Sequence, residues 1–253
     1  MTPAAGTPVS TYRLQIRPEF GFDQVALLAD YFHDLGVTHV YLSPILRATP
    51  GSQHGYDVVD HTRLNPEAGG QEAFDRMSAA LGARGIGCIA DVVPNHMAVP
   101  TPVRLNTALW SVLRDWPGSP YARWFDVDLS VPSRALLMPV LGKRIGQVVT
   151  DGELTVDRTG PEPVLRYYEH EFPLRPGTES LPVDALVERQ WYRLAWWRVA
   201  DDELNYRRFF DVDTLAALRV EDPEVFDRTH GLLLRLVEDG ALAGLRIDHP
   251  DGL

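Results

Sequence analysis

Short apolar runs alternate with amphipathic segments through the first hundred residues, and no other feature of the sequence restricts the fold as strongly. Residues 11–16, 38–42 and 87–93 have the length and character of β-strands. Residues 22–35 and 71–81 lie between them and place apolar side chains at helical spacing. Strands that alternate with helices in this way predict parallel strand–helix–strand units.

The alternation stops after the third strand. Between residues 97 and 189 the sequence has no clean period, and proline, glycine and short polar clusters are scattered through it. Residues 147–150 and 154–157 have the character of short strands. A stretch of this length without secondary structure is uncommon in a compact protein, so we predict a large inserted subdomain.

Helical periodicity returns at residues 190–200 and 223–239, and a fourth apolar run follows at 243–248. The predicted fold class is therefore α/β, a partial TIM (β/α)₈ barrel of about four β/α units with a large insertion after strand 3. The expected domains are residues 1–96 as the first part of the barrel, 97–189 as the inserted subdomain and 190–253 as the barrel continuation through strand 4. Unpaired edges on the first and fourth strands indicate a truncated chain. A small doubly wound α/β domain, complete as given, is the alternative.

Charge and composition limit the classes of partner. The net charge of −11 argues against nucleic acid, because binding phosphates requires clustered Lys and Arg, whereas a neutral sugar is compatible. No apolar run reaches the roughly eighteen residues of a transmembrane helix, so no membrane partner is expected. The N-terminus lacks the features of a signal peptide, and the single cysteine, Cys88, cannot form an internal disulfide. We therefore expect a cytoplasmic protein.

Polar side chains follow the third strand, in the segment Asp91-Val92-Val93-Pro94-Asn95-His96. In parallel barrels and open α/β sheets, ligand sites form at the carboxyl ends of the strands. Asp91, Asn95 and His96 are therefore candidate site residues. A polar strand-to-loop junction with an Asx turn is the alternative.

The fourth strand ends with a second polar cluster, Arg246-Ile247-Asp248-His249. Alternation along a strand places Arg246 and Asp248 on one face and Ile247 on the other, so the charged pair is expected to point into the barrel. A neighbouring guanidinium favours the ionised form of a carboxylate, and a carboxylate nucleophile must be ionised. The alternative is a structural ion pair in which Arg246 bridges Asp91 and Asp248.

A third cluster, Gly51-Ser52-Gln53-His54-Gly55-Tyr56-Asp57, follows the second strand. The glycines indicate a tight backbone, and His54, Tyr56 and Asp57 combine an aromatic face with hydrogen-bonding groups. This combination suits a pyranose ring, which has an apolar face and a rim of hydroxyl groups. An ordinary loop with a packed tyrosine is the alternative.

Together the three clusters resemble the signature regions of the α-amylase superfamily, glycoside hydrolase family 13. The pattern Asp-x-x-x-Asn-His ends a third strand and Gly-x-Arg-x-Asp ends a fourth, as in that family, and the Gly-Tyr-Asp segment resembles the element with its stacking tyrosine. Within the family, the chain is most similar to the maltooligosyltrehalose synthases. The supporting segments are Ser10–Gln15, Tyr41–Leu46, Gly51–Val58, Asp91–Met97, Asn205–Asp211 and Gly244–Leu253.

The resemblance implies a role for each candidate residue. Asp248 corresponds to the catalytic nucleophile, and Arg246 corresponds to the residue that orients it. The expected substrate-binding residues are Tyr56, Asp57, His54, Asp91, Asn95, His96 and His249. The general acid/base glutamate of the family lies further downstream. The expected partner is therefore the missing C-terminal part of the same enzyme, and we expect the chain to be inactive alone.

The reaction implied by the resemblance is an intramolecular transglucosylation. It converts the α-1,4 bond at the reducing end of a maltooligosaccharide into an α,α-1,1 trehalosyl bond, so the enzyme is an isomerase. We expect no cofactor and no metal, because the sequence offers no convincing carboxylate cage around Asn95, where some relatives bind Ca²⁺. The alternatives are an α-1,4-glucan hydrolase of the same superfamily and a non-catalytic, truncated glucan-binding protein.

Overall fold

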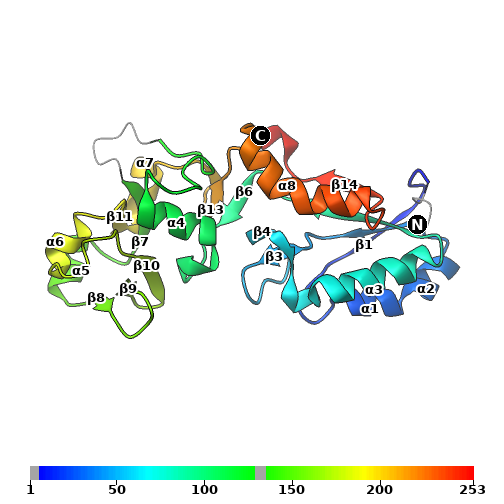
Figure 1. The fold of residues 1–253 in the computed structure, drawn as a ribbon, viewed down its shortest axis with the longest axis horizontal. Helices are drawn as coiled ribbons and strands as arrows, with labels where there is room; N and C mark the ends of the chain where they lie inside the picture. The colour runs from blue at the N-terminus through cyan, green and yellow to red at the C-terminus, as the bar shows by residue number, and fades with distance from the viewer. Residues whose placement is uncertain (1–5, 129–134) are drawn as a thin grey trace. The chain divides into compact units, whose positions relative to one another are not determined.

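The computed structural model describes residues 6–128 and 135–253 and divides into two compact units. The first unit combines Met1–Asn95 with Val220–Leu253, and the second is His96–Arg219 (Figure 1). The second unit therefore lies in the chain between two parts of the first. The sequence predicts an inserted subdomain over 97–189, whereas the compact unit runs thirty residues further, because its last strands pair with its first.

The first unit is built on a parallel sheet whose strands follow one another in chain order, β1-β2-β5-β14. The elements of this unit are β1 (Thr11–Leu14), α1 (Phe22–Leu27), α2 (Ala29–Asp34), β2 (His39–Leu42), β3 (Leu46–Ala48), β4 (Val58–Leu64), η1 (Pro66–Ala68), α3 (Gly70–Gly82), β5 (Gly87–Val92), α8 (Pro223–Glu238), β14 (Gly244–Ile247) and η4 (Pro250–Gly252). The predicted parallel α/β arrangement is confirmed. Its register places Arg246 of β14 directly opposite Asp91 of β5.

The helices of this unit form because their apolar side chains recur on one face. In α3 the buried side chains are Ala73, Phe74, Met77 and Leu81, and the helix packs against α1, alongside which it runs in Figure 1. Phe74 meets Phe22 of α1 edge to face, with ring centroids 5.4 Å apart. Burial of such a side chain contributes about 1.5–3 kcal/mol. The single helix expected over 22–35 is broken at Leu28, whose backbone leaves the helical region between α1 and α2.

Helix α8 begins at a clear helix-start signal in the sequence. The side chain of Asp222 accepts a hydrogen bond from the amide of Glu224 at 3.1 Å, and Pro223 occupies the first helical position. The helix buries Val225 and Leu233 on one face and packs against β4. No helix in the described part of the chain is long and apolar enough to cross a membrane.

The second unit is a mixture of short strands and helices. Its elements are β6 (His96–Ala98), η2 (Val103–Leu105), α4 (Thr107–Asp115), β7 (Leu136–Leu141), α5 (Ile145–Thr150), β8 (Leu154–Asp157), β9 (Val164–Tyr167), β10 (His170–Pro173), α6 (Val183–Val187), β11 (Tyr192–Trp196), η3 (Trp197–Val199), α7 (Ala200–Glu203), β12 (Arg208–Phe209) and β13 (Val212–Ala217). Its sheets have the strand orders β10-β9-β8, β11-β7 and β12-β13-β6.

Two expectations for this unit were wrong. The helix expected over 190–200 is largely strand β11, which pairs with β7 in parallel, and this pairing overrides a weak helical periodicity. The strand expected over 147–150 is the end of helix α5. Its β-branched residues favour a strand in isolation, but the turn is closed by Gly152 with φ of 70° and buries Val148 completely.

The two apolar residues of the edge strand β14, Leu245 and Ile247, differ in how far they are covered. Leu245 packs against the core of the unit, but Ile247 remains 40% exposed. Among the described residues, no strand pairs with the outer edge of β14. The end of β14, where the charged residues lie, is therefore an uncovered edge of the sheet.

Candidate functional site

An ionic network joins the carboxyl ends of β5 and β14. One guanidinium nitrogen of Arg246, Nη1, donates to Oδ1 of Asp91 at 3.0 Å and also to the carboxylate of Asp248. The side chain of Asp91 is fully buried, that of Asp248 is 16% exposed and that of Arg246 is 48% exposed. The amide of Asp248 donates to the carbonyl of Val92 at 2.9 Å, which fixes its backbone beside β5. Arg246 therefore bridges a buried carboxylate and a partly accessible one.

Two tyrosine hydroxyls complete the hydrogen bonding of Asp91. The hydroxyl of Tyr41, on β2, donates to Oδ2 at 2.8 Å, and that of Tyr56 donates to the same oxygen at 2.6 Å. A buried charge is tolerated only when it is paired and hydrogen-bonded, and Asp91 meets both conditions. Asp91 is thus fully engaged, which leaves Asp248 as the carboxylate available to a ligand.

The network also sets the protonation states of its donors. Burial raises the pKa of Tyr56 to about 12, and its hydrogen bond to Asp91 adds to this effect. The pKa of Tyr41 is raised for the same two reasons. Hydrogen bonds to Asp91 and Asp248 raise the pKa of Arg246. At neutral pH both phenols are therefore hydrogen-bond donors and the guanidinium is charged.

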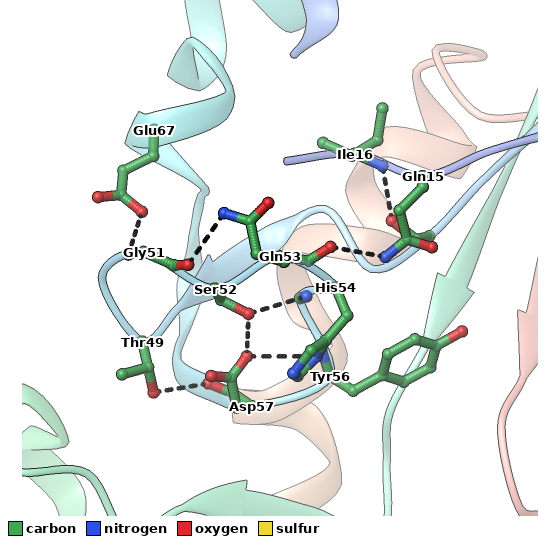
Figure 2. A network of polar contacts seen from close by, with 12 residues as sticks. Gln15, Ile16, Thr49, Gly51, Ser52, Gln53, His54, Tyr56, Asp57 and Glu67 are labelled. Atoms are coloured by element: carbon green, nitrogen blue, oxygen red, sulfur yellow. Dashed lines mark hydrogen bonds and ion pairs between the residues drawn. The ribbon is translucent and has the colours of Figure 1, made fainter. Parts of the chain in front are cut away.

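Tyr56 is carried by a loop, residues 49–57, whose internal contacts are drawn in Figure 2. The carboxylate of Asp57 accepts a hydrogen bond from Ser52 and lies 3.7 Å from Nδ1 of His54. The same His54 nitrogen accepts from the amide of Tyr56 at 3.0 Å. The side chains of His54 and Asp57 therefore meet each other inside the loop, while the ring of Tyr56 reaches out to Asp91.

Gly55 gives this loop its shape. Its φ of 79° favours glycine, and a Cβ at this position would lie 2.7 Å from the carbonyl oxygen of Pro44. The loop therefore presses its backbone directly against the segment that follows β2. This close approach brings Tyr56 within reach of the strand ends.

Two further candidates, Asn95 and His249, lie on the segments that follow these strands. Asn95 is buried, and a Cβ on Gly252 would lie 3.4 Å from its Oδ1, so the segment after β14 passes close to it. His249 has a φ of 48°, an uncommon conformation for a residue with a side chain. Strained residues of this kind cluster at functional sites, and this one follows Asp248 directly.

His96 is the first residue of the second unit. It begins β6, pairs with Ala217 of β13 and is 99% buried. Its ring lies 4.5 Å, centroid to centroid, from that of Phe209. These contacts anchor His96 within its own unit and do not include the residues of the ionic network.

Of the nine residues expected at the site, Tyr56, Asp91, Arg246 and Asp248 are joined by side-chain hydrogen bonds. His54 and Asp57 meet each other in the loop that carries Tyr56. The sequence did not reveal Tyr41 and Arg13, although both lie in segments that carry the family resemblance. Arg13, on β1, donates to the hydroxyl of Tyr56 at 3.3 Å. Arg13 lies opposite Tyr41 in the parallel pairing of β1 with β2. This register would have placed both residues at the site, and the sequence alone does not reveal it.

The chemistry available to this arrangement is that of a carboxylate paired with a guanidinium. An accessible, oriented carboxylate can act as a nucleophile toward an electrophilic carbon. Within residues 6–128 and 135–253, no group of three or more His, Cys, Asp or Glu side chains is arranged to hold a metal ion.

Comparisons with known proteins agree with one another. The family model for the catalytic domain of α-amylase matches residues 25–252. A putative maltooligosyl trehalose synthase of Mycobacterium tuberculosis is 41% identical over 252 residues, which is 97% of this chain and 31% of that protein.

Solved structures give the same result. The maltooligosyltrehalose synthase from Arthrobacter ramosus superposes with a TM-score of 0.91 at 46% identity, over 97% of this chain and 32% of that one. A hypothetical maltooligosyl trehalose synthase from Sulfolobus tokodaii has a TM-score of 0.83 at 38% identity, over 96% of this chain and 32% of that one. The chain thus spans about a third of the length of these relatives.

Proposed function

The chain belongs to the α-amylase family of glycoside hydrolases, and we propose that it forms part of a maltooligosyltrehalose synthase. The ion pair between Arg246 and Asp248 at the end of a parallel strand is the observation that carries this proposal. Identity of 41–46% to synthases over nearly the whole chain supports it. Because the chain covers about a third of those proteins, it acts as one segment of a longer enzyme.

In this proposal the sheet β1-β2-β5-β14 supplies the first four strands of an eight-stranded barrel. Its strands follow chain order, as barrel strands do, and its polar network lies at their carboxyl ends, where barrel enzymes hold their sites. The second unit is then the insertion after the third barrel strand. Further barrel strands, from the rest of the longer protein, would cover the exposed edge of β14.

Asp248 is the proposed nucleophile and Arg246 the residue that orients it. A retaining glycosidase needs two carboxyl groups roughly 5–5.5 Å apart, one as nucleophile and one as general acid/base. Asp91 cannot serve as the second, because its oxygens already accept hydrogen bonds from Arg246 and two tyrosines. The family resemblance implies that the acid/base comes from the remaining part of the enzyme.

The remaining candidates are proposed to hold the sugar. Tyr56 supplies the ring on which the attacked glucose stacks, with its hydroxyl fixed on Asp91. The other residues of this group are His54, Asp57, Asn95, His96 and His249. Asp57 acts mainly by supporting the loop, because its carboxylate accepts from Ser52 and faces His54.

The proposed reaction conserves every atom of the substrate. Asp248 attacks the anomeric carbon next to the reducing-end glucose, the α-1,4 bond breaks, and the acid/base protonates the departing glucose. That glucose stays bound and attacks the glycosyl-enzyme through its own anomeric hydroxyl, which releases Asp248 and forms an α,α-1,1 bond. Water competes with glucose as the acceptor, so transfer requires a closed pocket.

A chimera tests this function. The chain replaces the matching segment of the Arthrobacter ramosus synthase, and the purified chimera is incubated with maltopentaose. We expect reducing ends to disappear while the chain length stays constant, and we expect the isolated 253-residue chain to give no turnover. Release of glucose and maltose would instead identify an α-1,4-glucan hydrolase, and a folded but inactive chimera would refute the proposal.

A further inference from the structure

Two neighbouring side chains at the end of β1 reach the loop that carries Tyr56. We propose that Arg13 and Gln15, together the β1 clamp, are positioning residues that hold Tyr56 in place for the bound sugar. Arg13 lies on β1 and Gln15 directly follows it, so the two project to the same face. The inference rests on the proposed function for its kinetic consequence, but the clamp itself is a structural claim that can be tested alone.

The contacts of the clamp form a continuous chain. Nη2 of Arg13 donates to the hydroxyl of Tyr56 at 3.3 Å, and Nη1 of the same guanidinium donates to Oε1 of Gln15 at 3.0 Å. Nε2 of Gln15 donates in turn to the carbonyl of Gln53 at 2.9 Å, as Figure 2 shows. The clamp therefore holds the loop at its backbone and at the tip of the tyrosine.

The hydrogen bond that the Tyr56 hydroxyl accepts from Arg13 complements the one that it donates to Asp91. The Tyr56 hydroxyl donates its proton to Asp91 at 2.6 Å and uses an acceptor lone pair for Arg13. A phenol that donates in one direction and accepts from another has its ring orientation fixed. The guanidinium of Arg13 also lies 5.6 Å from the ring centroid of Tyr41, so three strands contribute to the position of one ring.

The contacts within the loop do not fix the ring of Tyr56 relative to β1. The hydrogen bond from Ser52 to Asp57 and the close approach of Gly55 to Pro44 determine how the loop folds on itself and against the segment after β2. Neither contact involves β1. The clamp connects β1 to the loop at Tyr56 and at Gln53, so its loss should loosen the loop locally and let the ring of Tyr56 move more freely.

The clamp is suited to positioning and contributes little to stability. Arg13 is exposed and Gln15 is only partly buried. Hydrogen bonds between such groups stabilise a fold weakly, since water replaces them on unfolding. Holding a substrate-contacting group within about 0.5 Å of its working position does, however, affect the rate of a reaction. We therefore expect a kinetic effect with little change in unfolding.

Hydrogen exchange tests the clamp directly, in the chimeric synthase described above. Arg13→Met and Gln15→Met remove the donors while keeping the length of the side chains. We expect the peptide spanning residues 51–57 to exchange about tenfold faster in the double variant, with its neighbours unchanged. Arg17→Met is the matched control, because Arg17 is an exposed arginine beyond β1 whose ion pair with Glu19 is 3.9 Å long. Unchanged exchange at 51–57 would overturn the clamp.

A double-mutant cycle then tests its kinetic role. Arg13→Met should lower kcat/KM for maltopentaose by about tenfold in the parent and by less than about twofold in a Tyr56→Phe background, where the clamped hydroxyl is absent. Independent, multiplying effects would show that Arg13 does not act through Tyr56. If the parent chimera transfers no glucose, the proposed function fails, while the exchange result still decides the clamp.

Discussion

Asp91 organises the candidate site through its hydrogen bonds. Its buried carboxylate accepts hydrogen bonds from Arg246, Tyr41 and Tyr56, which lie on two strands and a loop. Removing one partner of a buried charge leaves the charge uncompensated, and such changes are strongly destabilising. The arrangement therefore fixes Arg246, and through it Asp248, in a single orientation.

Replacement of the proposed nucleophile is expected to separate catalysis from binding. Asp248→Asn keeps the shape of the side chain but removes its negative charge, so transfer by the chimera should fall by at least about 10³-fold. Binding of maltopentaose, measured by calorimetry, should stay within about threefold of the parent, because Tyr56 and its partners are unchanged. Parental turnover in this variant would remove Asp248 from its proposed role.

Some candidate residues could be predicted from sequence because local patterns carry them. Arg246 and Asp248 alternate on one strand, and Asp91 ends another, so periodicity and motif suffice. Arg13, Gln15 and Tyr41 could not be predicted in the same way. Their contacts depend on the register between strands and on a loop whose shape is decided by a close contact with Pro44.

At the scale of elements, the sequence predicts most of the first unit and much less of the second. Strands β2 and β5 and helix α8 agree with their predicted positions to within about two residues, because burial on fixed faces gives a clear period. In the second unit, short elements are determined by pairing with distant partners. Strand β11, predicted as helix, is held by β7 about fifty residues earlier in the chain.

The loop before β4 offers a matched pair of glycines. Gly51 and Gly55 both have a φ of 79°, but a Cβ would meet nothing within 4 Å at Gly51 and would meet Pro44 at Gly55. We expect Gly51→Ala to cost about 1 kcal/mol of unfolding free energy and Gly55→Ala at least about 1 kcal/mol more. Urea unfolding of both variants measures the difference, and equal costs would show that the close approach to Pro44 does not matter.

At the scale of the whole molecule, each of the two units has its own elements and sheets, and the second is inserted in the chain between parts of the first. The second unit leaves the parallel strands of the first unit in chain order. It cannot be delimited from sequence alone, because the last strands of the second unit, β12 and β13, resemble a continuation of the first. The pairing of β13 with β6, and of β12 with β13, assigns both strands to the second unit.

Buried histidines make the first unit sensitive to acid. Burial lowers the pKa of His39 and of His230 from 6.5, so the folded chain binds fewer protons than the unfolded chain just below that pH. Their contribution to stability is complete above pH 6.5 and is lost as the pH falls below it.

We therefore expect the urea midpoint to fall between about pH 8 and about pH 5.5, and to fall less in a His39→Gln/His230→Gln variant. His33→Gln is the control for replacing a histidine at an exposed position. A midpoint that is equal at the two pH values would argue against this source of acid sensitivity.

Trapping the covalent intermediate examines the role of Asp248 without relying on products. The chimera is treated with a glucosyl fluoride whose ring fluorine slows breakdown of the glycosyl-enzyme, and its peptides are then analysed by mass spectrometry. One added fluoroglucosyl group on the peptide containing Asp248, absent from Asp248→Asn, is the predicted result. A label on any other residue, or an unlabelled enzyme that still turns over maltopentaose, would contradict it.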